Sequence, residues 1–372
     1  MVSSQAMDSE PDGVASATAS GSQIDDAAAA PVEAAAGALD AKADPVAPIE
    51  ATTGAIMSAQ ADPGAHKVLR VVAGRFSMRQ RLVELWRRRE LFAFLVRKDI
   101  KVKYKNSVLG ILWSMLNPAL NTTVFFVLFT YLLPNGIPNF VIYLISGQLV
   151  WNYFSTAVLG STGAVVNNAG IVKKVAFPRE ILSLSAVGSA FIFFLFQAVV
   201  LVGLLLVLSH SPDWADLWLL VPALLAVTLF ASALAVFLSA VNVYLRDTQH
   251  LVEVILNAWF WAIPAVYSFA KTVGPKLATH WIGLKYIYFA NPITPVVMTF
   301  QRVFYANIAP AVITRSKVPG VAPVTTHPPV LANYGTHWYL VADLLVAAVS
   351  VLLLFGAMTV FGRLEGNFAE EL

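Results

Sequence analysis

The sequence runs from Asn106 to Val172 without a single charged residue. A helix needs about 20 apolar residues to cross the hydrocarbon core of a bilayer, so this stretch is long enough for more than one crossing. Of all 372 residues, 58% are hydrophobic and 13% are charged, whereas about a quarter of the residues of a soluble domain are charged. The chain holds too few polar side chains to cover itself in water, and we predict that lipid is its main solvent.

Six charge-poor runs are candidates for membrane-spanning segments, and they lie at residues 109–133, 139–161, 182–208, 217–244, 254–270 and 340–361. We expect α-helices in all six, because backbone groups in lipid must be hydrogen-bonded within a helix or a closed barrel. The period-2 alternation of a barrel is absent. The sequence therefore predicts an all-α integral membrane protein in which residues 108–372 form a domain of six transmembrane helices per subunit.

The distribution of basic residues predicts the orientation of these spans. Thirteen Lys and Arg residues lie within residues 66–105, while the short loops LPNGIPN and SHSPDWAD hold none. We therefore expect a multi-pass protein whose N- and C-termini are cytoplasmic. The loops at residues 161–181 and 245–253 then also face the cytoplasm.

Two segments of opposite charge precede the first predicted span. Residues 1–65 hold ten acidic residues and one basic residue, are rich in Ala and hold no aromatic side chain, so we predict a disordered extension. Residues 66–107 form a basic cytoplasmic segment in which apolar side chains recur at helical spacing from Arg81 to Ser107. This pattern predicts an amphipathic helix on the inner membrane surface. An ordinary basic flank that fixes the topology is the alternative. The predicted interface residues are Trp86, Arg87, Arg88 and Arg89.

Residues 277–310, between the fifth and sixth predicted spans, are apolar and aromatic but interrupted. Asn291-Pro292 and Pro295 break any single crossing helix. Irregular backbone at membrane depth survives only where protein or a water-filled cavity covers it. We predict a re-entrant pair of gate helices at the outer face, followed by a loop at residues 311–336.

The residues of common catalytic and metal sites are scarce. The chain has no Cys and its six His residues show no ligand spacing, so we expect no disulfide and no metal site. Asp213 and Asp216 follow Ser211-Pro212, as expected of a helix start. Asp343 lies near the outer end of its predicted span, where solvation at the interface is the first interpretation and a functional acid the alternative. No phosphate-binding G-x-x-x-x-G-K-[ST] loop occurs, so we expect no catalytic residues and no ATP site in this chain.

Amides and aromatic rings are the features left to form a transport path. Asn117 and Asn121 are four residues apart on the first predicted span, and they suit an aqueous path and a helix contact equally well. Three aromatic clusters follow, with the sequences VWNYF, AWFWAIPAVYSF and WIGLKYIYF. They are typical of the aromatic belt at a lipid interface, but flat rings also pack on the apolar faces of sugars. The sugar-channel hypothesis predicts a lining of Asn117, Asn121, Trp259, Phe260, Trp261 and Tyr267, with Tyr286 and Tyr288 at the outer gate.

A pore without an energy source needs a contact for a motor, and two charged cytoplasmic turns offer one. The first is GIVKKVAFPREI, a predicted short helix that Pro178 ends before the third span begins. The second is VYLRDTQHLVE, at the inner turn between the fourth and fifth predicted spans. We predict that a soluble ATPase docks on these turns through Lys173, Lys174, Phe177, Pro178, Arg179, Glu180, Arg246 and Asp247.

Together these segments resemble the permease subunits of ABC-2-type polysaccharide exporters, which move O-antigen, teichoic acid and related lipid-linked glycans. The resemblance covers about residues 80–372. It is carried, in order, by RELFAFLVRKDIKVKYKNSVLGILW, KKVAFPREILSLS, YLRDTQHLVEVILNAWFWAIPAVYSF and NPITPVVMTFQRVFY. Residues 1–65 have no counterpart in the family pattern and are assigned no function.

The resemblance implies a transport subunit of the bacterial plasma (inner) membrane, not an enzyme. It implies a homodimer of six-span subunits with two copies of a separate ATPase, which would bind the ATP and Mg²⁺. The cargo would be a lipid-linked polysaccharide. The Ala-rich bias of residues 1–65 suggests a high-GC actinobacterium, where a galactan-type cell-wall polymer is a natural cargo. Two other classes stay open: an ABC-2 exporter of small lipids or drugs, and a membrane glycosyltransferase acting on lipid-linked sugars.

Overall fold

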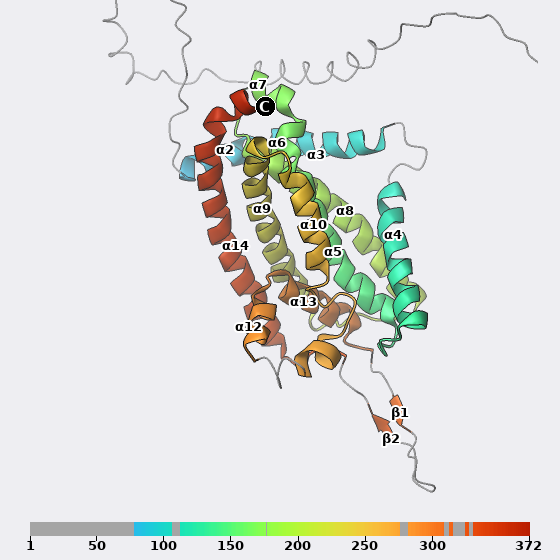
Figure 1. The fold of residues 1–372 in the computed structure, drawn as a ribbon. Helices are drawn as coiled ribbons and strands as arrows, with labels where there is room; N and C mark the ends of the chain where they lie inside the picture. The colour runs from blue at the N-terminus through green and yellow to red at the C-terminus, as the bar shows by residue number, and fades with distance from the viewer. Residues whose placement is uncertain are drawn as a thin grey trace, which may run out of the picture. The chain divides into compact units, whose positions relative to one another are not determined.

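Helices make up nearly all of the part of the chain that the structure describes (Figure 1). The computed structural model describes residues 78–105, 112–175, 177–275, 282–308, 312–314, 324–326 and 330–372. These residues belong to a unit that comprises Val71–Leu372. The prediction for residues 1–65 lies outside the described residues. Within them, the predicted all-α class is confirmed apart from one short hairpin.

Among the described residues, four helical stretches are long and apolar enough to cross a membrane: Met115–Leu132, Glu180–Val207, Leu217–Tyr244 and Thr336–Asn367. They are built from α4 (Leu112–Val127) with the π-turn η2 (Leu128–Leu132), α8 (Glu180–Val207), the 3₁₀ turn η3 (Leu217–Leu219) with α9 (Leu220–Tyr244), and α14 (Thr336–Leu364) with the 3₁₀ turn η5 (Glu365–Asn367). These four stretches coincide with the first, third, fourth and sixth predicted spans.

Helix α5 (Phe140–Thr162) lies among these helices and coincides with the second predicted span. It packs against α8, α9 and α13 (Ile293–Tyr305). Its 23 residues give about 34 Å of helix, which is enough to cross a bilayer. It is less apolar than the four stretches above because it carries Gln148 and Asn152.

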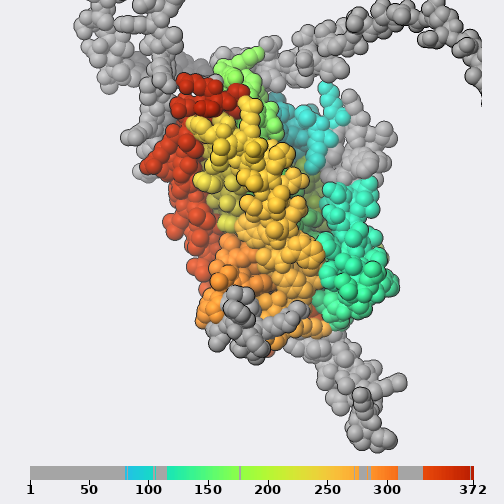
Figure 2. Space-filling model, in the orientation of Figure 1, coloured from blue at the N-terminus to red at the C-terminus, as the bar shows by residue number. Residues whose placement is uncertain are grey.

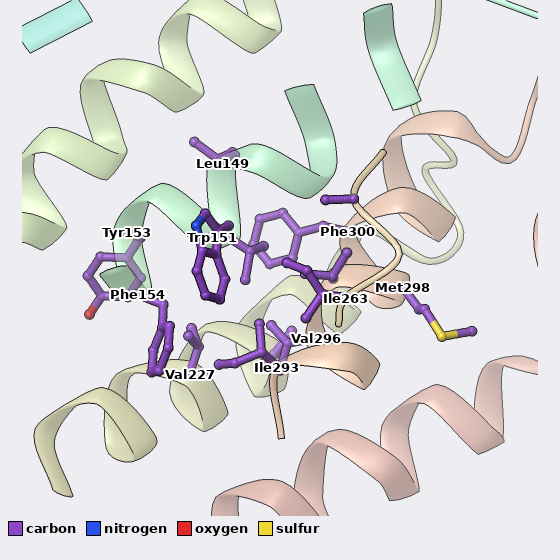
Figure 3. Packing of buried hydrophobic residues seen from close by; sticks show 14 of the residues in the cluster. Leu149, Trp151, Tyr153, Phe154, Val227, Ile263, Ile293, Val296, Met298 and Phe300 are labelled. Atoms are coloured by element: carbon purple, nitrogen blue, oxygen red, sulfur yellow. The ribbon is translucent and has the colours of Figure 1, made fainter. Parts of the chain in front are cut away.

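The core lies where α5, α9 and α13 meet. Figure 3 shows Trp151 and Phe154 of α5 close to Val227 of α9 and to Ile293 and Val296 of α13. All five side chains are buried. Since lipid is as apolar as this core, close packing of the side chains holds the helices together, and removal from water contributes little.

The fifth predicted span is only partly helical. Helix α10 covers Thr248–Phe260, whereas the sequence predicts a helix over residues 254–270, so this prediction is wrong beyond Phe260. Pro264 explains the difference, because proline has no backbone N–H and its ring would clash with the carbonyl of Phe260 in a continuous helix. The chain continues as an irregular segment at residues 261–268.

Side chains from α5 and α13 satisfy the backbone of this irregular segment. Tyr143 Oη donates to the carbonyl oxygen of Pro264 at 3.0 Å, and Gln301 Nε2 donates to the same oxygen at 2.6 Å. Gly147 allows the close approach, because a Cβ there would lie 3.1 Å from the Cα of Ala265. An unpaired carbonyl in hydrocarbon costs several kcal/mol, so these donors permit the break in α10.

A pair of helices follows where the sequence predicts one. Helices α12 (Ile282–Ala290) and α13 are separated at Asn291-Pro292. Every residue of α13 except Arg302 is buried. By contrast, Tyr286 of α12 is 74% exposed. The two helices therefore differ in kind: α13 belongs to the core of the bundle and α12 to its surface.

Two small elements flank this pair. The π-turn η4 (Phe269–Val273) precedes it. Strands β1 (Val312–Thr314) and β2 (Val324–Thr326) follow and pair antiparallel. The hairpin and the start of α14 at Thr336 correct the prediction of a plain loop over residues 311–336.

Short elements gather at one end of the bundle, opposite to α12 (Figure 1). They are α2 (Met78–Arg87), α3 (Arg89–Tyr104), α6 (Ala164–Asn167), α7 (Ala169–Lys174) and α15 (Phe368–Glu371). We call this the basic end, because most described Lys and Arg residues lie in these elements and in the turns beside them.

The segment predicted to form the interface helix folds as two helices. Helices α2 and α3 meet at Arg88, whose φ of −88° and ψ of 21° depart from helical values, so the prediction of one continuous helix is wrong at this residue. The break lets α2 contact α14 while α3 contacts α8. Helix α3 runs across the bundle instead of along it (Figure 1).

Replacing Gln301 by Leu is expected to destabilise the protein, because the buried Pro264 carbonyl loses its amide donor while the side chain keeps its size. The expected loss is about 0.5–1.5 kcal/mol, the usual net contribution of one hydrogen bond, because Tyr143 still donates to the same carbonyl. Thermal unfolding of the detergent-solubilised protein measures it. Adding Tyr143→Phe should cost more than the two single changes together, because both donors are then gone. Unchanged stability of the Gln301→Leu variant would contradict this account of the break.

Candidate functional site

A cavity of about 510 Å³ is lined by residues of α4, α5, α8 and α10. Five of its lining residues carry side-chain amides, and all four helices contribute: Asn117, Asn121, Asn152, Gln197 and Asn257. We call it the amide cavity. Helices α4 and α10 are both visible on the face of the bundle that Figure 2 shows. The wall of the cavity can both donate and accept hydrogen bonds, since each amide carries an oxygen and an NH₂ group.

Helical spacing places the two amides of α4. Asn117 and Asn121 are i and i+4 and therefore project from one face of the helix, and both are exposed. Thr122, the next residue, has its Oγ1 at 2.5 Å from Gln148 Oε1 of α5. Phe125 and Phe129 also pack on rings of the core, but no residue of the apolar stretch from Met115 to Leu132 is fully buried.

The amides of α5 and α8 are joined to each other. Asn152 Nδ2 donates to Gln197 Oε1 at 3.2 Å. The bond uses one donor and one acceptor, which leaves the Asn152 oxygen and the Gln197 NH₂ group for other partners. The pair thus fixes the orientation of both side chains while each keeps hydrogen-bonding capacity.

Among the described residues, two charged side chains line the amide cavity, those of Lys103 of α3 and Glu253 of α10. Lys103 Nζ lies 4.3 Å from the centroid of the Phe193 ring. Desolvation lowers the pKa of Lys103 below its usual value. The rest of the wall is neutral, which suits an uncharged ligand with many hydroxyl groups better than a charged one.

The structure brings Asn117 and Asn121 to the amide cavity, but none of the predicted aromatic residues lines it. Phe260 is buried, and its ring centroid lies 5.8 Å from that of Trp151, which does line the cavity. Trp261 is 53% exposed. Their place along a path between two copies of the chain stays a prediction.

Three of the other predicted aromatic residues form hydrogen bonds in the region around α12. Trp259 Nε1 donates to Asn291 Oδ1 at 3.1 Å, which ties α10 to the start of α13. The hydroxyls of Tyr267 and Tyr288 lie 3.3 Å apart. Tyr286 is the exposed member of the group. Trp281, in the third aromatic cluster, lies outside the described residues.

Sequence reasoning missed three of the five amides and Trp151. Asn152 and Trp151 stand inside the cluster VWNYF, from which the predicted lining takes no residue. Gln197 and Asn257 are isolated amides in otherwise apolar runs. An amide that faces lipid is costly, so each isolated amide within a predicted span is a signal for a path or a polar helix contact.

The first predicted motor contact, residues 173–180, has an exposed and a buried part, and we call it the first polar turn. Lys173 and Lys174 end α7 and are exposed. Glu180 is 1% exposed and forms an ion pair with Arg81 of α2. The two lysines are therefore free to meet a partner, whereas Glu180 is held inside the chain.

Two residues between the lysines and Glu180 also contact other parts of the same chain. Phe177 packs against the buried apolar cluster of the basic end, and Arg179 donates to the backbone oxygen of Glu365. Helix α7 ends at Lys174, and Val175 is already extended. The prediction that Pro178 ends this helix is therefore wrong, since the chain leaves the helix before it reaches the proline.

The second polar turn, Leu245 to Asp247, leads into α10. Arg246 and Asp247 are both exposed. The Thr248 backbone N–H donates to the Leu245 carbonyl at 2.9 Å and closes the turn. Asp247 precedes the first residue of α10, where a negative charge is favourable.

Two acids near the opposite end, Asp216 and Asp343, are bound inside the protein, whereas Asp213 is half-buried. Asp216 accepts from Arg302 Nε at 2.8 Å and from Thr336 Oγ1 at 2.9 Å. Asp343 is fully buried, and its Oδ2 lies 2.8 Å from Thr299 Oγ1. The interpretation of Asp343 as an acid solvated at the interface is therefore wrong, because α13 covers it. In the described ranges no group of three or more metal-ligating side chains occurs.

Residues 90–305 match the family described as ABC-2 type transporter. The chain is 30% identical over 289 residues to the O-antigen export system permease protein RfbA of Myxococcus xanthus, and the alignment covers 78% of this chain and 98% of that protein. It is 28% identical over 219 residues to a Klebsiella pneumoniae protein of the same name, with 59% of this chain and 82% of that protein covered. The matched region includes all the amides of the cavity and both polar turns.

We expect a cysteine placed at Asn121 to react with a membrane-impermeant maleimide in intact vesicles of both orientations, because the amide cavity holds water. A cysteine at Val127 is the matched control, since Val127 projects from a different side of the same helix, is 42% exposed and does not line the cavity. In hydrocarbon its thiol does not ionise and should stay unlabelled. The chain has no native cysteine to interfere. Equal labelling at both positions would contradict a water-filled cavity.

Proposed function

The chain belongs to the ABC-2 type transporter family, and we propose that it is the permease subunit that exports a lipid-linked polysaccharide across the bacterial inner membrane. The observation that carries the proposal is the amide cavity, whose wall is neutral except for Lys103 and Glu253. The relatives named O-antigen export system permease support the same class of cargo.

The amide cavity fits the chemistry of a sugar chain. Hydroxyl groups donate and accept hydrogen bonds, as amides do, and five amides spread over four helices offer many weak contacts. A polymer that slides needs such contacts, because one tight site would stop it. Trp151 adds a ring at the same wall, on which the apolar face of a sugar can pack.

Six crossings are proposed for each subunit: α4 with η2, α5, α8, α9, α10 with the segment after it, and α14. By the distribution of Lys and Arg, the basic end faces the cytoplasm, with both termini on that side. Helices α2 and α3 then lie at the inner membrane surface. Placing Arg87, Arg88 and Arg89 at the bilayer centre instead would cost about 2.5–3.5 kcal/mol each. Helices α12 and α13 form the re-entrant pair at the outer face.

A second copy of the chain is proposed to close the path. The apolar stretch of α4 is unburied, while the same helix presents Asn117 and Asn121 to the amide cavity. One subunit supplies only part of a wall, and a homodimer that meets along this face would enclose the amides. The predicted aromatic residues of α10 would then lie further along the same path.

Energy is proposed to come from two copies of a separate ATPase, which bind the ATP and Mg²⁺. Lys173 and Lys174 of the first polar turn and Arg246 and Asp247 of the second are exposed at the same end of the bundle. They form the proposed contact. The conformation of the first polar turn is held by its less exposed residues, Phe177, Pro178, Arg179 and Glu180.

A membrane glycosyltransferase is less well supported by the geometry. Such an enzyme needs a free carboxylate near its sugar substrate. Asp216 and Asp343 are buried and bound by Arg302 and Thr299. Asp213 is half-buried and accepts from the Ala215 backbone N–H at 3.1 Å, so it is the carboxylate that such an enzyme would have to use.

Replacing Asn121 and Asn257 together by Leu is expected to lower polymer export about tenfold, because two hydrogen bonds of about 0.7 kcal/mol each are lost along the path. Lipid-linked polymer should accumulate inside the cell while the amount of the protein is unchanged. Gln at both positions keeps the amides and should retain most export. Val127→Leu, on a different side of α4, is the matched control. Normal surface polymer with impaired export of a small lipid would instead favour the drug or lipid exporter.

A cysteine at Lys174 is expected to cross-link to the partner ATPase with a short thiol–amine reagent. Trp214→Cys is the control, because Trp214 is 71% exposed and follows the end of α8 that lies away from the first polar turn. Cross-linked bands are read on gels after purification of the complex. A product from Trp214→Cys and none from Lys174→Cys would invert the proposed topology.

A further inference from the structure

One arginine joins three segments that are far apart in the sequence. Arg81 of α2 pairs through Nη1 with Glu180 at the start of α8, and its Nη2 lies 2.5 Å from Oε1 of Glu365, just after α14. Burial lowers the pKa of Arg81, but the two carboxylates outweigh this effect and raise the pKa above its usual value. Removing one partner of such a buried group leaves an uncompensated charge, which is strongly destabilising.

A glycine makes room for this contact. A Cβ added at Gly362 of α14 would lie 2.6 Å from Nη2 of Arg81 and 2.7 Å from its Cζ. Both distances are too short for real contacts. The guanidinium therefore lies directly against the backbone of α14, and a Cβ at this position would shift the end of the flexible Arg81 side chain.

The C-terminal residues contact Arg179 in the first polar turn and Tyr244, which directly precedes the second. The ring of Phe368 is fully buried, and the guanidinium carbon of Arg179, in the first polar turn, lies 5.8 Å from its centroid. Tyr244, the residue before the second polar turn, meets the same ring edge-on at 6.0 Å. Tyr244 Oη also donates to the Leu364 carbonyl at 2.8 Å. A single phenyl ring thus lies between the two turns.

We propose that residues 365–372 form a brace that fixes the first polar turn, the second polar turn and α2 to one another as one rigid body. Apart from the brace, the two turns are joined by the buried apolar cluster of the basic end, on which Phe177 and Tyr244 both pack. When the brace is in place, a displacement of the exposed lysines of the first polar turn also displaces the start of α10 and helix α2. Glu365 and Phe368 are positioning residues in this account. The use of the brace in transport rests on the proposed function, but its rigidity does not.

The test measures the distance between the two polar turns directly. Spin labels are attached to Lys174→Cys and Arg246→Cys in the full chain, which has no other cysteine, and the protein is placed in lipid nanodiscs. Both sites are exposed and hold a label without disturbing the core. Pulsed electron paramagnetic resonance then gives the distribution of distances between the two labels. The sample contains no ATP, cargo or ATPase. We expect a narrow distribution in the otherwise unchanged chain.

Two variants remove the brace in different ways. Phe368→Ala deletes the ring between the turns, and Gly362→Ala displaces the Arg81 guanidinium without changing any charge. Both should broaden the distribution. Asn367→Ala is the matched control, because Asn367 is exposed and neighbours the ring, and it should leave the distribution narrow. If Phe368→Ala fails to fold, Gly362→Ala decides alone. A distribution as narrow as that of the unchanged chain in folded Gly362→Ala overturns the brace.

A second measurement separates the brace from the proposed function. In the complex with the ATPase, Gly362→Ala should raise the amount of ATP hydrolysed for each polymer exported. A broadened distribution with an unchanged ratio overturns the role of the brace in transport, while the proposed cargo stands. Loss of polymer export in the cavity variants tests the cargo independently.

Discussion

Hydrocarbon offers no hydrogen-bond partner, and the rest of the structure depends on how the chain meets this constraint at Pro264. The proline stops α10 partway along the bundle, and the freed carbonyl accepts from Tyr143 and Gln301. Gln301 can do this only because α13 lies inside the bundle, where all its residues but one are buried. The shortened α10 then ends three residues beyond Asn257, so an amide of the cavity lies close to the break.

The amide cavity shows why polar residues are kept on helices that also face lipid. Amides at membrane depth are costly unless they meet protein or water. Asn152 and Gln197 satisfy each other in part, but Asn117 and Asn121 stand on a helix whose apolar stretch is unburied. Their position is explained if a second subunit and a hydrated sugar chain complete their surroundings.

The helices that cross the bilayer are predictable from the sequence, because long charge-free runs leave few alternatives. The spans predicted at residues 182–208 and 217–244 correspond to observed helical stretches of nearly the same length. The failures have a common cause, which is contact between distant segments. Whether a Pro ends a span depends on donors elsewhere, so the effect of Pro264 could not be judged without Gln301.

In the candidate site, too, residues placed by local spacing are predictable, and residues placed by distant contacts are not. Asn117 and Asn121 are predictable because their spacing is local. Glu180 was grouped with the exposed lysines from sequence, but Arg81, about a hundred residues earlier, draws it inward. Charge in the sequence marks the polar turn, while only the fold shows which charges remain available to a partner.

The central claim is that a neutral sugar chain moves along the amide cavity. An electron cryo-microscopy structure of the complete exporter in a lipid nanodisc, stalled with its polymer by a non-hydrolysable ATP analogue, tests it most directly. The account predicts saccharide density beside Asn117, Asn121 and Asn257, enclosed by two copies of the chain. Saccharide density that passes elsewhere, with lipid acyl chains filling the amide cavity, would contradict it.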